Sequence, residues 1–207
     1  MTTILVTGFG PFPGAPFNPT GPLVQALARL KRPRLADVKI IGHVFATSYA
    51  AVDHELPALI ARHKPDALLM FGLAPRAKTL RIETRARNAL ALLPDAGGAS
   101  AGSKIAIAAP AARALPAPTV HLVNAVRAAR VPAILSHNAG RYLCNYLCWR
   151  AAEAAVKPGG PRLAAFVHVP PLRRKPRPRR AKARLSAEDL ARAGTRLLLT
   201  LTAAARR

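Results

Sequence analysis

Three residues of this sequence have the side chains that a nucleophilic catalyst needs: Cys144, His168 and Glu83. Cys144 follows a short apolar strand and a tight turn, and it stands near the start of an expected helix. The positive end of a helix dipole and the unpaired N–H groups there stabilise a thiolate, the nucleophilic form of cysteine. Taken alone, this stretch is equally typical of a cysteine that is simply buried.

A thiol nucleophile requires an imidazole to take up its proton and a carboxylate to fix the tautomer and orientation of that imidazole. His168 lies at the end of an apolar strand. Glu83 stands between Ile82 and Thr84 in a segment, residues 80–87, whose alternation is typical of a strand. In open parallel sheets, ligands bind outside the carboxyl ends of the strands. We expect such strand ends at Gly8, Gly72, Gly140 and His168.

Strand-like and helix-like segments alternate along the chain, which predicts an α/β fold with an open, mostly parallel twisted sheet and helices on both faces, in three layers. The length of 207 residues suits one domain, residues 1–207. The expected strands are residues 3–7, 38–46, 66–71, 133–136 and 162–169, and residues 80–87 are expected to form a strand or an extended segment. The expected helices are residues 20–30, 48–62, 120–129, 142–156 and a last one that Ser186 caps.

The strongest feature of the composition is a formal net charge of +23, from 32 Lys and Arg against 9 Asp and Glu. Nucleic acid is the obvious partner for so basic a chain. The densest basic run, residues 173–184, has no apolar side chain that could join a core, so we expect a solvent-exposed loop there. Because no aromatic residues interleave with this run as base stacking requires, the sequence does not favour a nucleic-acid partner.

The remaining patterns argue against disulfides, metals, dinucleotides and membranes. Cys144 and Cys148 share one expected helix turn, a geometry that forms no ordinary structural disulfide, so a reducing compartment, the cytoplasm, is expected. They form no CxxC pair, so no metal site is expected. Pro13 stands where a dinucleotide fingerprint needs glycine, so no cofactor is expected. No apolar run is long enough to span a membrane.

Two phenylalanines, Phe9 and Phe12, lie in the Pro- and Gly-rich loop that follows the first strand. They could form the wall of a small apolar pocket, or they could pack beneath the loop.

Four segments of the chain resemble the pyroglutamyl peptidase I (pyrrolidone-carboxylate peptidase) family of cysteine peptidases. The most specific of them carries the pattern A-G-x-[FY]-x-C-N at residues 139–145. The four segments are TGFGPFPGAPFNPT at residues 7–20, GLAPRAKTLRIETRARN at 72–88, SHNAGRYLCNYL at 136–147 and FVHVP at 166–170.

The resemblance implies a role for each matching residue. Cys144 takes the place of the nucleophile, His168 before Val-Pro that of the catalytic histidine, and Glu83 that of the catalytic glutamate. Phe9 and Phe12 match the walls of the pyroglutamyl pocket, to which Leu73 is also assigned. The implied function is removal of an N-terminal pyroglutamyl residue from a small peptide through a thioacyl-enzyme, without cofactor or metal, by a homodimer or homotetramer.

The sequence also departs from the family's usual pattern. Residues 75–77 read Pro-Arg-Ala where the family often has Gly-Gly-Arg, and the arginine of a later D-A-R-I-P-D-N stretch is missing after Asn88. Two other functions therefore stay open. One is an amidase or peptidase of the same fold with a different N-terminal acyl specificity, and the other is a non-catalytic binding protein that uses its basic surface.

Overall fold

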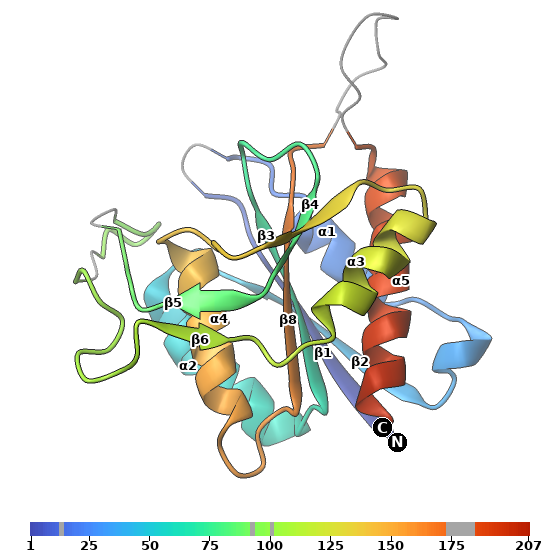
Figure 1. The fold of residues 1–207 in the computed structure, drawn as a ribbon, viewed down its shortest axis with the longest axis horizontal. Helices are drawn as coiled ribbons and strands as arrows, with labels where there is room; N and C mark the ends of the chain where they lie inside the picture. Colours follow the sequence, from blue (N-terminus) through green and yellow to red (C-terminus); the bar gives the residue numbers. More distant parts are fainter. Residues whose placement is uncertain (13–14, 92–93, 100–101, 173–184) are drawn as a thin grey trace, which may run out of the picture.

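A six-stranded sheet forms the centre of the molecule (Figure 1). The computed structural model describes residues 1–12, 15–91, 94–99, 102–172 and 185–207. The strands are ordered β2-β1-β3-β8-β4-β7, and each neighbouring pair is parallel except β8 with β4. In chain order, the strands of this sheet are β1 (Thr2–Phe9), β2 (Val38–Phe45), β3 (Ala67–Leu73), β4 (Leu80–Glu83), β7 (Ala133–Ser136) and β8 (Leu163–Val169).

Helices cover both faces of this sheet, so the predicted three-layer α/β architecture is confirmed (Figure 1). A second, two-stranded antiparallel sheet is formed by β5 (Arg85–Arg87) and β6 (Ala112–Ala114). One face carries α1 (Thr20–Ala28), α3 (Thr119–Ala128) and α5 (Ala187–Ala205), and the other carries α2 (Tyr49–His63) and α4 (Leu143–Ala155). A short 3-10 helix, η1, spans Pro33–Leu35.

The central strands are apolar on both sides because each side packs against helices. In β3, Leu69 and Phe71 pack on the side of α1 and α5, while Leu68 and Met70 pack on the side of α2 and α4. All four are fully buried. Alternating side chains of a strand point to opposite faces, so this one run of sequence contributes to both cores.

The reversed direction of β4 follows from a short connection. β3 ends at Leu73 and β4 begins at Leu80, and a parallel crossover needs about a dozen residues or more. The chain therefore turns back at the carboxyl edge of the sheet and enters β4 from that edge. As a result, Arg81 lies opposite His168, and Glu83 lies opposite Phe166.

Two details of the predicted layout were wrong. Gly140 is not at a strand end, because β7 stops at Ser136 and Gly140 lies in the following turn with φ of +87°. That left-handed conformation suits glycine, which has no Cβ. The expected strand 80–87 is two strands, which separate at Thr84, where the chain leaves the main sheet for β5. The expected basic loop, 173–184, lies outside the described residues.

None of the helices in the described part of the chain is long and apolar enough to cross a membrane.

Candidate active site

A cavity of about 380 Å³ opens at the carboxyl ends of β1, β3 and β8. Five of the six predicted site residues line it: Phe9, Phe12, Leu73, Cys144 and His168. The sixth, Glu83, is completely buried behind His168. Residues from five different parts of the chain thus meet at the edge of the sheet where open α/β folds bind their ligands.

Cys144 is the second residue of α4, which begins at Leu143. The preceding residue, Tyr142, is extended and provides no side-chain cap, and the first amides of a helix have no carbonyl of their own helix to donate to. These N–H groups belong to the same helix start that carries Cys144. Cys144 is partly exposed and is not in a disulfide. The helix positions it as the sequence predicts.

Cys148 lies one helical turn further along α4, and its surroundings differ from those of Cys144. It is fully buried, and burial raises the pKa of its thiol well above the ordinary value, with the charges of Cys144 and Glu83 adding to the effect. Since the thiolate is the reactive form, Cys148 is an inert core residue.

A buried hydrogen bond joins His168 to Glu83. The His168 Nδ1 lies 2.8 Å from Glu83 Oε1, and the two residues are 6% and 0% exposed. With Nδ1–H donating to the carboxylate, the other ring nitrogen, Nε2, is the one available to the thiol. The ring of Phe166 packs edge-on against the imidazole, with 5.0 Å between ring centroids. The hydrogen bond to Glu83 and the contact with Phe166 together fix the orientation of the His168 imidazole.

The electrostatics of this group favour an imidazolium. Burial by itself lowers the pKa of His168, but the charge of the Cys144 thiolate, a hydrogen bond to it and the hydrogen bond to Glu83 raise the pKa to about 9. A pKa in this range keeps His168 protonated at neutral pH, next to the sulfur of Cys144. Such a pair is a nucleophile together with a proton donor.

Two residues near the cavity were missed by the sequence reasoning. Asn145 is fully buried. Its side-chain amide accepts a hydrogen bond from the backbone N–H of Arg87 and donates hydrogen bonds to the carbonyls of Arg87 and Ala89. These bonds connect the chain after Glu83 to the helix that carries Cys144. The signal available in the sequence was a polar residue on an otherwise apolar helix face.

The second residue, Arg81, also lines the cavity. Because residues two apart on a strand point to the same face, its position two residues before Glu83 could have predicted this placement.

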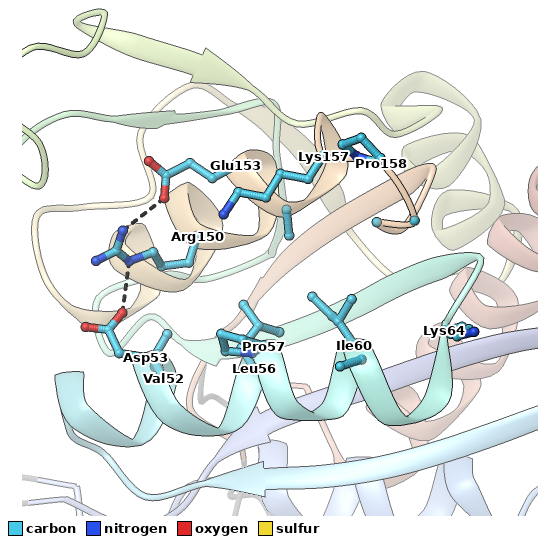
Figure 2. A pocket seen from close by; sticks show the side chains of 14 residues that line it. Val52, Asp53, Leu56, Pro57, Ile60, Lys64, Arg150, Glu153, Lys157 and Pro158 are labelled. Carbon is cyan, nitrogen blue, oxygen red and sulfur yellow. Dashed lines mark hydrogen bonds and ion pairs between the residues drawn. The ribbon is translucent and has the colours of Figure 1, made fainter.

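A second cavity, of about 530 Å³, lies between α2 and α4, away from the thiol (Figure 2). Arg150, at one end of this cavity, is held by Asp53 at 2.9 Å and by Glu153 at 3.0 Å. None of the described residues that line it is a cysteine or a histidine. Within the described parts of the chain, no three His, Cys, Asp or Glu side chains are grouped as metal ligands.

The family model described as pyroglutamyl peptidase matches residues 2–187. The chain belongs to the pyroglutamyl peptidase family. It is similar to the pyrrolidone-carboxylate peptidase of Pyrococcus furiosus, with 32% identity over 169 residues, covering 81% of this chain and 80% of that protein. The corresponding protein of Cupriavidus pinatubonensis is 30% identical over 207 residues, which cover 99% of this chain and 94% of its own.

The solved structure of pyrrolidone carboxyl peptidase from Thermococcus litoralis has the same fold. It aligns with a TM-score of 0.87 at 27% identity, covering 97% of this chain and 93% of that one. The family resemblance stated from four sequence segments is thereby confirmed, and this member of the pyroglutamyl peptidase family is a cysteine peptidase.

The contrast between the two cysteines predicts selective alkylation. At pH 7, iodoacetamide should modify Cys144 in the folded protein and leave Cys148 unmodified, as measured by peptide mass spectrometry. His168→Gln should slow the modification by about tenfold or more, because an ordinary thiol is only a few per cent thiolate at this pH. Cys148→Ala is the matched control and should keep the wild-type rate. An equal rate in His168→Gln would contradict the activation of Cys144 by His168.

Proposed function

We propose that this pyroglutamyl peptidase family member removes an N-terminal pyroglutamyl residue from small peptides, with Cys144 as nucleophile, His168 as acid and base, and Glu83 as the residue that orients His168. The observation that carries the proposal is the placement of this trio at an apolar cavity. Phe9, Phe12 and Leu73 would form the walls against which the pyroglutamyl ring lies.

The chemistry proceeds in two stages. The Cys144 thiolate attacks the carbonyl carbon of the pyroglutamyl residue, and as the C–N bond breaks, the imidazolium of His168 gives its proton to the departing amine. The result is a thioester and a neutral imidazole. His168 then takes a proton from water, the hydroxide attacks the thioester, and pyroglutamate leaves as the thiolate and imidazolium re-form.

The start of α4 supplies the charge stabilisation that both stages need. Its free amides are placed to donate to the oxyanion of each tetrahedral intermediate, and one such donor is typically worth about 3 kcal/mol of transition-state stabilisation. The substrate ring is a neutral lactam without a free amine. A pocket for it therefore needs no carboxylate, and none of the described residues that line the cavity has one.

A different N-terminal acyl specificity is supported by one observation. Pro75, which stands where the family often has glycine, lines the cavity itself. Proline fixes its backbone and adds a ring, so it changes both the stiffness and the shape of this wall.

Hydrolysis of three fluorogenic amides separates these functions. The wild-type protein should release the fluorophore from a pyroglutamyl amide, and the prolyl and free glutaminyl amides should be hydrolysed at least about 100-fold more slowly, because a charged amine finds no partner in the pocket. Cys144→Ala should lose all measurable activity. A preference for the prolyl or glutaminyl amide would show the altered acyl specificity, and full activity of Cys144→Ala would refute the nucleophile.

The raised pKa of His168 predicts the alkaline limb of the pH profile. Because the protonated imidazole must protonate the leaving amine, kcat/KM should fall about tenfold per pH unit above about pH 9, where His168 loses its proton. A series of initial rates between pH 6 and pH 10.5 measures this limb. A limb near the ordinary histidine value of about 6.5 would contradict the coupling to Cys144 and Glu83.

Residues 1–207 are proposed to act as one domain, in copies that associate as a homodimer or homotetramer in the cytoplasm. The free thiol of Cys144 suits a reducing compartment. Association is supported by the edge strand β7, where Ile134 and Leu135 are 43% and 39% exposed. Light scattering of the purified protein should give twice or four times the mass of 21.9 kDa. A monomer at micromolar concentration would contradict it.

A further inference from the structure

Arg81 is a cation at the active-site cavity that has no hydrogen-bond or ion-pair partner among the residues the structure describes. It lies on β4, lines the cavity and is half-buried. All nine carboxylates of the chain lie in the described residues, and none of them pairs with the Arg81 guanidinium. Even Glu83, two residues away on the same strand, keeps its Oε2 without a hydrogen bond.

The sheet register places Arg81 on the same side as the reactive groups. Residues two apart on a strand point to the same face, so Arg81 shares the face of Glu83. Arg81 is also directly opposite His168 in the antiparallel pair, and opposed side chains in such pairs lie about 5 Å apart at Cβ. Because β4 enters from the carboxyl edge, Arg81 is nearer the mouth of the site than Glu83 is.

This position is on the side of the leaving group. In the proposed reaction His168 hands its proton to the departing amine, so the residue that carries this amine lies next to His168 and hence next to Arg81. Among the described residues that line the cavity, the charged ones are Arg81 and His168, both basic. A carboxylate on the leaving residue would therefore meet a guanidinium with free donors, which can bind it through two parallel hydrogen bonds.

We infer that Arg81 is a specificity residue that selects substrates with a carboxylate on the residue after pyroglutamate. This inference rests on the proposed pyroglutamyl peptidase function. The carboxylate is either the free α-carboxylate of a pyroglutamyl dipeptide or the side chain of an aspartate at that position. Arg81 determines which substrates bind productively, whereas Cys144 and His168 carry out the cleavage of the amide bond.

Two matched substrate pairs test the inference and distinguish the sources of the carboxylate. Pyroglutamyl-alanine is compared with its C-terminal amide, and pyroglutamyl-aspartyl amide with pyroglutamyl-asparaginyl amide. In at least one pair, wild-type kcat/KM should be higher for the charged member by about tenfold or more, the usual effect of a hydrogen bond to a charged group. The pair that shows the preference identifies the source.

Removal of the guanidinium should abolish that preference. Arg81→Gln should bring the ratio of the two kcat/KM values close to one, and Arg81→Lys should keep part of it, which also guards against misfolding of the first variant. Arg76→Gln is the matched control: Arg76 is exposed in the loop between β3 and β4, does not line the cavity, and loses the same charge. It should keep the wild-type ratio. A preference that survives in Arg81→Gln, or equal rates within both wild-type pairs, overturns the inference.

Binding without turnover separates this inference from the proposed function. Calorimetry with Cys144→Ala and the same four compounds should show tighter binding of the charged member, lost when Arg81→Gln is added. That result supports the role of Arg81 even if the wild-type protein hydrolyses none of the compounds, which would count against the pyroglutamyl function alone. Equal binding of both members of each pair overturns the role of Arg81.

Discussion

The hydrogen bond between Glu83 and His168 is the interaction on which the site depends. A fully buried carboxylate is costly unless it is paired, and this one has a single hydrogen-bonding partner for one of its two oxygens. The pair exists because β4 enters the sheet backwards between β8 and β7. A parallel β4 would start at the opposite edge of the sheet, and Glu83 would not reach the histidine. The short β3–β4 connection therefore decides the chemistry.

Backbone packing then places the sulfur against this pair. A Cβ added at Gly72 would lie 2.6 Å from the Cys144 Sγ and 2.7 Å from the Phe166 ring, so only glycine lets β3 approach the thiol this closely. Asn145 stabilises the position of the helix that carries Cys144, because it hydrogen-bonds the chain that follows Glu83 to this helix. The nucleophile on α4 and the glutamate on β4 are each held by an element that contacts β8, the strand of the histidine.

In so basic a chain, most of the nine carboxylates hold backbone amides or arginines in place. Asp95 accepts from the amides of Tyr49, Gly97 and Ala99, Asp66 accepts from the amide of Thr3, and Asp189 completes the capping box of α5 with Ser186. Many arginines must then go without an acidic partner. Most can remain in solvent at little cost, but a half-buried one at the mouth of a cavity gains a function from its free donors.

The sequence by itself determined the α/β class, the main strands and helices, and the cysteine-peptidase chemistry, because apolar periodicity, helix caps and the motif around Cys144 are local properties. It placed Cys144 at a helix start and Glu83 on a strand, and both predictions are confirmed. The reversal of β4 and the split at Thr84 were decided only by the tertiary structure. Both depend on which strands become neighbours. The approach of Gly72 to the sulfur and the position of Arg81 at the cavity depend on the same kind of long-range contact. Contacts between residues distant in the chain leave no periodic signal in it.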